Sequence, residues 1–397
     1  MKDWSNPDFL TDHIRHTMDF YHPRAIDPSG GFFHFYKDDG TVYDVRQRHL
    51  VSSTRFIFNY AMAFRQFGVP AYKDAVWHGV QFLRKAHRNP DTGGYAWLLD
   101  WDAGTAQAKP LDSTNHCYGL AFVLLAYSHA IMAGFEEARA WVDETFALME
   151  QHFWEPHAGL YADEANAQWQ LGRYRGQNAN MHACEALLTA FEATGQTRFL
   201  DRAEVLTQHI TRRQAALAGS LIWEHYHADW SVDWDYNRHD KSNIFRPWGF
   251  QTGHLTEWAK LLLILERHRP ADWLLPRAMA LFDTAMLRGW DAAHGGLVYG
   301  FDTEGQVCDG DKYFWVQAES FAAAALLDKR SGEVRYRDWA DCIWDTSWTH
   351  FVDHTHGAWY RILAPDNSKV TDEKSPAGKT DYHTMGACYE VLHHALP

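Results

Sequence analysis

A short motif of glycine, aromatic residues and turn-forming polar residues recurs six times along the 397-residue chain, at residues 28–44, 90–107, 156–170, 221–235, 293–309 and 355–372. Five copies carry a marker glycine, and successive markers lie 63, 65, 137 and 61 residues apart, at Gly31, Gly94, Gly159, Gly296 and Gly357. The 137-residue interval contains the fourth copy, which lacks the glycine. A unit that recurs every ~60–70 residues indicates a closed or stacked repeat architecture.

Each copy has alternating aromatic residues around a turn, which is typical of a short β-hairpin. Between copies lie two segments with apolar residues at helical spacing, for example 49–68 with 71–88, 116–134 with 135–154, and 181–195 with 197–213. We therefore expect an all-α fold, an (α/α)6 barrel whose helices are connected on one side by short β-hairpins. The composition shows no break or linker, so residues 1–397 are predicted to form a single domain.

The charge and cysteine content exclude several classes of protein. The net charge is −14, from 51 acidic and 37 basic residues, whereas nucleic acids and anionic membranes select basic surfaces. No apolar run approaches the length of a membrane span, and the N-terminus has no apolar signal region. The five scattered cysteines include no CxxC pair, which argues against a disulfide framework or structural zinc. These features predict a cytoplasmic protein.

The stretch GHLTEW, at residues 253–258, carries two functional groups at the start of a predicted helix whose following residues are mostly apolar. His254 and Glu257 are three residues apart and share a helix face, so the carboxylate could hold the imidazole's tautomer and raise its basicity. A surface ion pair is the alternative. The flanking Leu255 and Trp258 leave little of this helix for solvent, which favours a functional role.

Two further helix starts carry histidine. NANMHACEALL repeats the His-x-x-Glu spacing at His182 and Glu185, with Asn178 one turn earlier. Helix capping would explain the asparagine but not the histidine. In KTDYHT, His383 lies where a polar loop enters the last helix, and by itself it is equally consistent with an exposed loop residue.

The remaining helix starts carry charged or polar groups in apolar surroundings. Arg55 lies within a long apolar segment, and Trp315 and Glu319 are four residues apart before an Ala/Leu run. His116 follows Asp112 in LDSTNHCYG, where the aspartate could equally be a helix cap. Burying one unpaired charge costs several kcal/mol, so a repeated pattern of this kind indicates a shared cavity at the mouth of the barrel.

The strings NANMHACEA, PWGFQTGHLTEWAKLL, FWVQAE and DYHT resemble the N-acylglucosamine 2-epimerase superfamily. The resemblance runs in order from Arg55 to His383, nearly the whole chain. It implies an (α/α)6 barrel that acts on a monosaccharide without a metal or cofactor. HLVSSTRF and KYFWVQAES are similar to the mannose isomerase and mannose 2-epimerase branch.

By this resemblance, His254 and His383 are the catalytic histidines. The resemblance implies substrate contacts from Arg55, Asn178, His182, Glu257, Trp315 and Glu319. Phe245, Arg246 and Trp248, in the loop before GHLTEW, are expected to close over the sugar. We add His116 to the predicted substrate-binding residues.

The predicted reaction begins at the C2 proton of an open-chain aldose, which is acidic because C1 is a carbonyl. His383 would remove this proton while Arg55 or His182 stabilises the enediolate. His254, oriented by Glu257, would open the sugar ring and make the second proton transfer. Protonation at C1 gives a ketose, so the chain is predicted to interconvert mannose and fructose, or related pairs such as lyxose and xylulose. Protonation on the opposite face of C2 gives the alternative activity, a sugar 2-epimerase.

Other classes remain open from the residues alone. A glycoside hydrolase of the same barrel type would use a carboxylate pair, for which Glu257 and Glu319 are the candidates. Two His-x-x-Glu pairs could bind a divalent metal, and a non-catalytic sugar-binding protein would need no histidine pair. The sequence leaves the oligomeric state open between monomer and homodimer.

Overall fold

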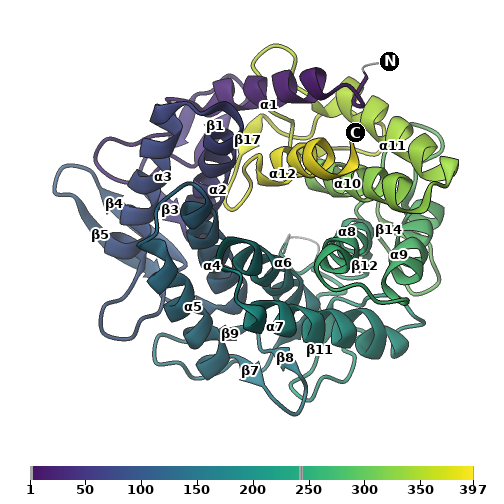
Figure 1. Ribbon diagram of the computed structural model, residues 1–397, viewed down its shortest axis with the longest axis horizontal. Coiled ribbons are helices and arrows are strands. Elements are labelled where there is room, and N and C mark those ends of the chain that lie inside the picture. The colour runs from purple at the N-terminus through teal and green to yellow at the C-terminus, as the bar shows by residue number, and fades with distance from the viewer. Residues whose placement is uncertain (1–2, 241–242, 244, 397) are drawn as a thin grey trace.

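The computed structural model describes residues 3–240, 243 and 245–396, and helices dominate these residues. Six of the helices form an inner ring: α2 (Leu50–Phe67), α4 (Cys117–Met132), α6 (Gln177–Thr194), α8 (Thr252–His268), α10 (Phe314–Ser331) and α12 (Tyr382–Glu390). Six surround them: α1 (Pro7–Tyr21), α3 (Pro70–Phe82), α5 (Ala138–His152), α7 (Thr197–Gln208), α9 (Leu274–Gly289) and α11 (Val334–Thr346). Figure 1 shows the inner helices around a common centre. The predicted helical class is confirmed.

Contacts between helices close the inner ring. Each inner helix contacts the next, from α2 through α4, α6, α8 and α10 to α12, and α12 returns to α2. The outer helices α3, α5, α7, α9 and α11 each pack on the inner helix that precedes them in the chain. Helix α1 instead packs against α12 at the other end of the chain. The N-terminal helix therefore completes the unit that the C-terminal helix begins.

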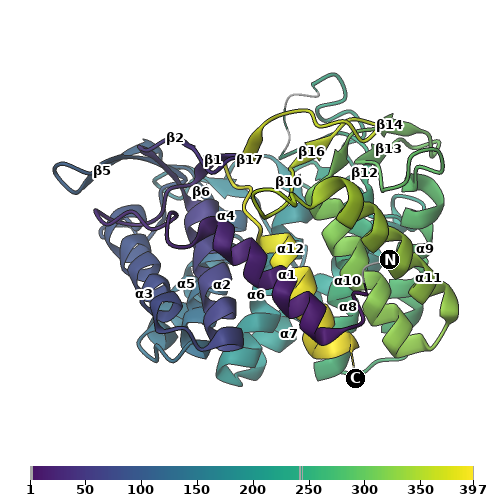
Figure 2. The ribbon, with the colours of Figure 1, turned by 90° about the horizontal axis from the view of Figure 1, so that it is seen from above.

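Short antiparallel strands lie at one end of the helices, above them in Figure 2. They are β1 (Phe35–Lys37), β2 (Val42–Asp44), β3 (Gln47–His49), β4 (Leu98–Asp102), β5 (Gln107–Asp112), β6 (Asn115–His116), β7 (Trp154–Glu155), β8 (Leu160–Tyr161) and β9 (Glu164–Ala165). The later ones are β10 (Arg175–Gly176), β11 (His225–Tyr226), β12 (Phe250–Gln251), β13 (Gly300–Phe301), β14 (Val307–Asp309), β15 (Lys312–Tyr313), β16 (Ile362–Leu363) and β17 (Glu373–Ser375). The predicted hairpins include the pairs β1–β2, β4–β5, β7–β8 and β13–β14.

A second set of strand pairs sets the starts of the inner helices. The strand before each inner helix pairs with the strand after its outer partner, as in β3–β4, β6–β9, β10–β11, β12–β13, β15–β16 and β17–β1. Five of the inner helices begin at the residue after such a strand, whereas α12 begins seven residues after the end of β17. The strand pairs therefore position the first turns of these five helices.

The burial of the two rings follows from their sequences. Residues 50–63 of α2 are buried on every side, as are most residues of α4 and α10, which are rich in Ala, Leu and Phe. A helix that is apolar all round fits a position between other helices. The outer helix α7 buries one face, with Phe199, Leu200, Ala203 and Leu206, and exposes charged residues on the other.

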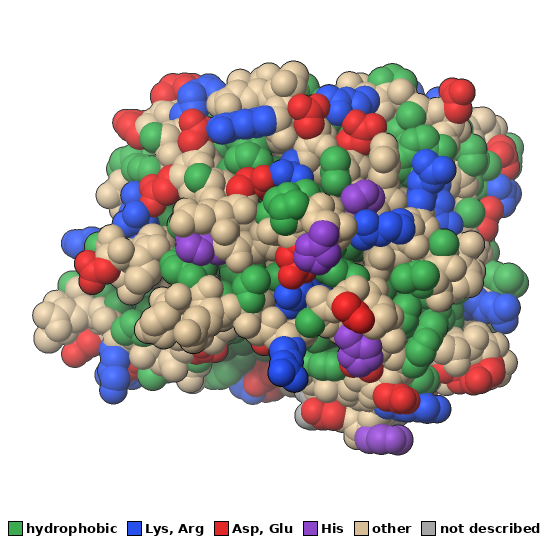
Figure 3. All heavy atoms as spheres, turned by 90° about the horizontal axis from the view of Figure 1, so that it is seen from below, with side chains coloured by type: hydrophobic (Ala, Val, Ile, Leu, Met, Phe, Trp, Pro, Cys, Tyr) green, Lys and Arg blue, Asp and Glu red, His purple; other side chains and the backbone are tan. Residues whose placement is uncertain are grey.

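The surface shows no preference for one charge on the face drawn in Figure 3, where acidic and basic side chains are interspersed. Among the described residues, no helix is both long enough and apolar enough to cross a bilayer.

Candidate active site

The first turns of the inner helices and their preceding loops line a cavity at the strand end. Its lining residues are Arg55, Tyr118, Asn178, His182, Phe245, Pro247, His254, Glu257, Tyr299, Trp315, Lys379 and His383. Every inner helix contributes a side chain. Eight of the residues predicted from the sequence are among them, so the structure brings most of the candidate site together.

His254 is held by a carboxylate from a different segment. Its Nδ1 lies 2.9 Å from Oε1 of Glu224, and both groups are buried. The Gln177 amide donates to the other Glu224 oxygen at 2.9 Å, and its own oxygen accepts from the Trp258 indole at 2.7 Å. A carboxylate bonded to one ring nitrogen orients the imidazole and leaves the other nitrogen for proton transfer.

The predicted pairing of His254 with Glu257 is therefore wrong. Both Glu257 oxygens are buried and make no hydrogen bond to the described residues. Helical spacing places the two residues on adjacent parts of one face, but the Glu257 side chain turns toward His182, with Oε1 3.9 Å from the imidazole Nδ1. Burial and the neighbouring Glu319 raise the pKa of Glu257 well above its usual range.

His383 forms the second histidine–carboxylate pair. Its Nδ1 lies 2.7 Å from Oε1 of Glu319, and its Nε2 lies 3.2 Å from a guanidinium nitrogen of Arg55. Arg55 also donates to the Gly378 carbonyl at 2.5 Å and to the Tyr118 phenol at 3.2 Å. Burial and the positive charge of Arg55 lower the pKa of His383 well below its usual range, so the ring is neutral and able to accept a proton.

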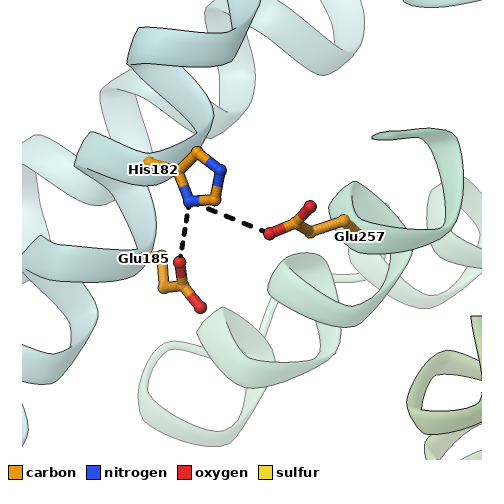
Figure 4. Close-up of side chains that lie close together, drawn as sticks. All are labelled: His182, Glu185 and Glu257. Carbon is orange, nitrogen blue, oxygen red and sulfur yellow. Dashed lines mark hydrogen bonds and ion pairs between the residues drawn. The ribbon is translucent and has the colours of Figure 1, made fainter. Parts of the chain in front are cut away.

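A buried charge cluster supports the cavity from behind. The Lys260 ammonium lies 2.5 Å from Glu319 and 3.8 Å from Glu185. Figure 4 shows the carboxylates of Glu185 and Glu257 directed at the His182 ring, with Glu185 3.0 Å from Nδ1. Burial lowers the pKa of His182 to about 4, so this ring is also neutral.

Several polar atoms of lining residues have no hydrogen-bond partner among the described residues. They are Nε of Arg55, Oδ1 of Asn178, both carboxyl oxygens of Glu257 and Nε1 of Trp315. Buried polar groups in proteins are almost always paired, because leaving one unpaired costs about 1–3 kcal/mol. Donors and acceptors gathered around one cavity indicate a ligand with several polar groups, such as a sugar.

The close approach of α8 and α10 depends on one glycine. A Cβ added to Gly253 would lie 2.4 Å from the Trp315 ring. The absence of a side chain lets His254, the next residue, lie beside this indole, with ring centroids 5.0 Å apart. The glycine of GHLTEW thus places the histidine at the cavity.

Three predicted residues do not line this cavity, and a fourth stands behind it. Glu319 supports His383 from the far side. His116 lines an adjoining cavity, where the centroid of its ring lies 4.2 Å from that of Trp97. Arg246 lines the same adjoining cavity and forms an ion pair with Glu164 at 2.5 Å.

The last of the three, Trp248, lines a different neighbouring cavity and donates its indole N–H to the Trp234 carbonyl at 2.6 Å. Of the three loop residues expected to close over the sugar, only Phe245 faces the histidines.

Sequence reasoning missed four lining residues, Tyr118, Pro247, Tyr299 and Lys379, and the support from Gln177 and Glu224. Lys379 begins the quoted string KTDYHT, and Glu224 lies in the fourth hairpin motif as the only acidic residue among aromatic neighbours in LIWEHYH. Both residues stand out in the sequence, but Glu224 lies far along the chain from His254, and Lys379 lies in a loop before the last helix.

Two groups of side chains have the geometry of metal ligands. They are His182 with Glu185 and Glu257, and Glu257 with Glu319 and His383. The ammonium of Lys260 already neutralises Glu185 and Glu319. A divalent ion would have to compete with this buried cation, so the donor set fits a metal poorly.

Comparisons with known proteins identify the family of the chain. Residues 31–387 match the N-acylglucosamine 2-epimerase (GlcNAc 2-epimerase) family. A D-mannose isomerase of Marinomonas mediterranea is 57% identical over 97% of this chain and 96% of its own. A D-mannose isomerase of Thermobifida fusca is 38% identical over 75% of this chain and 73% of its own.

Solved structures give the same picture. A crystal structure of a D-mannose isomerase superposes with a TM-score of 0.95 at 55% identity and covers 98% of both chains. A cellobiose 2-epimerase from Spirochaeta thermophila shares the fold, with a TM-score of 0.86 at 23% identity over 98% of this chain and 96% of its own. The family match and the relatives lead to one conclusion: this chain belongs to the N-acylglucosamine 2-epimerase family.

Proposed function

We propose that this protein is an aldose–ketose isomerase that interconverts D-mannose and D-fructose. The observation that carries the proposal is the pair of buried histidine–carboxylate dyads facing one cavity. The Trp315 ring lies 5.0 Å from the His254 ring and 5.7 Å from the His383 ring, so one small sugar can reach both. The 57% identity to a D-mannose isomerase supports mannose as the substrate.

The reaction follows from the protonation states. His383 is neutral and takes the C2 proton, and Glu319 stabilises the imidazolium that forms. The electron pair of the C–H bond becomes the C1–C2 double bond, and negative charge develops on the C1 oxygen. Arg55, beside His383, stabilises that charge. Return of the proton to C1, with transfer of the C2 hydroxyl proton to the C1 oxygen, gives the ketose.

The second dyad serves the hydroxyl protons. His254, held by Glu224, opens the pyranose ring by moving a proton between the anomeric hydroxyl and the ring oxygen. Asn178, Glu257 and Trp315 hold the sugar through the polar atoms that lack a protein partner. His182, neutral and adjacent, is a further hydrogen-bonding group for the enediolate.

We also propose that the inner and outer helices make up an (α/α)6 barrel and that the chain is a single domain. The closed ring of contacts between the inner helices supports both proposals. The free cysteines, three of them buried, suit a reducing cytoplasm. We expect a monomer or homodimer that works without metal, so full activity after dialysis against EDTA is the predicted result.

Two other activities compete with this proposal. A 2-epimerase would use the same dyads and differ only in where the proton returns. A glycoside hydrolase would need two carboxylates facing the scissile bond. Glu319 is instead bonded to His383 and Lys260 and does not line the cavity, which disfavours hydrolysis.

Incubation of the protein with D-mannose and chromatographic separation of the products tests the proposal. Fructose as the product supports the isomerase, whereas glucose identifies an epimerase. Release of a reducing sugar from a mannose disaccharide without fructose formation would instead identify a hydrolase. In D2O, deuterium at C1 of the fructose would show that the proton passes through a group that exchanges with solvent.

A further inference from the structure

Lys379 occupies a fixed position in the loop between β17 and α12. The backbone N–H of Lys379 donates to the Pro376 carbonyl at 2.9 Å, and its carbonyl accepts from the Ser375 hydroxyl at 2.9 Å. The preceding Gly378 is bonded through its N–H to Ser52 and through its carbonyl to Arg55. Both Ser52 and Arg55 lie on α2, so the loop that carries the lysine is attached to the inner ring.

The Lys379 side chain lines the cavity with the histidines. Its ammonium lies 6.0 Å from the Trp315 ring centroid and 5.5 Å from that of Phe245. Among the described residues, no carboxylate forms an ion pair with it and no side-chain acceptor bonds to it. The buried Lys260 and Lys374, by contrast, each have a carboxylate within 2.7 Å. Lys379 is thus a cavity lysine without a protein counter-ion.

The charges around Lys379 explain why it is unusual. Arg55 on α2, Arg361 and the Lys379 ammonium repel one another, while Glu257 on α8 offers only partial compensation because burial favours its neutral form. Burial, together with the two arginines, lowers the pKa of Lys379 to about 7. A cavity cation repelled by two neighbouring arginines gains most from a negative charge that appears in the cavity.

We propose that Lys379 is a further catalytic residue, whose ammonium group donates a hydrogen bond to the sugar oxygen on which negative charge develops during enolisation. The inference rests on the proposed isomerase function. Lys379 and Arg55 would together stabilise the negative charge on the sugar oxygen, on the cavity wall that carries His383.

The step is balanced without any additional reactant. The C2 proton moves to His383, the C–H electron pair becomes the C1–C2 double bond, and the carbonyl electrons move onto the C1 oxygen. Lys379 keeps its proton and shares it in a hydrogen bond with this oxygen. The C2 hydroxyl proton then passes to the C1 oxygen through His254, and the imidazolium returns its proton to C1. C2 becomes the carbonyl, the negative charge leaves the C1 oxygen, and the ammonium is again without a partner. The interaction is therefore strongest at the transition state, which is the requirement for raising kcat.

The first test replaces the ammonium by an uncharged side chain of similar length. Lys379→Met should lower kcat for mannose by about 100-fold, the loss typical of one oxyanion donor, with KM changed by less than about threefold. Lys109→Met, at an exposed position on β5, is the matched control and should retain wild-type kinetics. A kcat within about threefold of wild type, or a loss confined to KM, would overturn the proposal.

The second test measures binding and is independent of turnover. The hydroxamate of D-arabinonic acid mimics a planar, anionic enediolate, whereas mannitol is a neutral open-chain polyol. Calorimetric titration of folded Lys379→Met should show hydroxamate binding weakened by at least about 10-fold and mannitol binding unchanged. Equal weakening of both ligands, or of neither, would refute the charge-specific role. If wild-type protein fails to isomerise mannose, the proposed function fails, and this comparison still decides the role of Lys379.

Discussion

Glu224, 30 residues earlier in the chain, orients the His254 ring through a contact of 2.9 Å between its Oε1 and Nδ1 of the imidazole. His383 is held in the same way by Glu319, 64 residues earlier, at 2.7 Å. In both dyads the carboxylate belongs to another element than the histidine. The arrangement makes each imidazole depend on the packing between neighbouring units of the ring, and it gives each carboxylate a testable role.

Glu224→Gln should lower kcat by about 100-fold, because the amide cannot stabilise the imidazolium form of His254. Glu257→Gln should instead act mainly on KM, since Glu257 lines the cavity and does not bond to His254. Steady-state kinetics with mannose separates the two effects, with the exposed Glu136→Gln as control. The assignment would be wrong if Glu257→Gln lost kcat while Glu224→Gln kept it.

His254→Ala and His383→Ala should each abolish turnover of mannose, with losses of at least about 10²–10⁴-fold, because each removes a group that moves a proton. The fold should survive, as shown by an unchanged circular dichroism spectrum. His157→Ala, at an exposed position, should behave as wild type. Near wild-type activity in either catalytic variant would refute the two-histidine mechanism.

Lys260→Met should destabilise the protein by about 3–5 kcal/mol, because it leaves a buried carboxylate without its cation. The affected pair is Lys260 with Glu319, whose charged atoms are 2.5 Å apart and almost fully buried. Urea denaturation measures the change, and the exposed Lys329→Met should lie within about 0.5 kcal/mol of wild type. The double variant Lys260→Met/Glu319→Gln should recover part of the loss. Full stability in the single variant would contradict the role of the ion pair.

Stability should fall as the pH is lowered from about 6.5 toward 4. Burial lowers the pKa of six histidines from 6.5 to about 4 or 3: His13, His49, His87, His116, His129 and His182. Between these values the unfolded chain binds protons that the folded protein does not, so the free energy of unfolding decreases with falling pH.

Urea denaturation at pH 7, 6 and 5 checks this dependence. Asp163, whose pKa burial raises to about 7, acts in the opposite direction, as do Glu257 and Glu319, whose pKa values burial also raises. These are three groups against six. The slope near pH 5.5 should therefore exceed about 1.4 kcal/mol per pH unit, the value for a single proton. An unfolding free energy that stays constant from pH 7 to 5 would show that these histidines titrate normally.

Local sequence patterns predicted which residues lie at the candidate site, but not where all of their side chains point. Arg55, His182, His254 and His383 each lie near the start of an inner helix, and all four line the cavity. The predicted pairing of His254 with Glu257 failed because helical spacing brings two residues to the same face without setting where their side chains point. Trp248 also lies away from this cavity, because a hydrogen bond to Trp234 holds its indole elsewhere.

By itself the sequence determined the repeat, the helical class and the delivery of polar groups to the starts of the inner helices, because these follow from periodicity within short segments. The tertiary structure alone decided that α1 completes the unit begun by α12. It also decided that Glu224 orients His254 and that Lys379 enters the cavity without a counter-ion. These relationships join residues far apart in the chain, and their distances exist only once the ring of helices has closed.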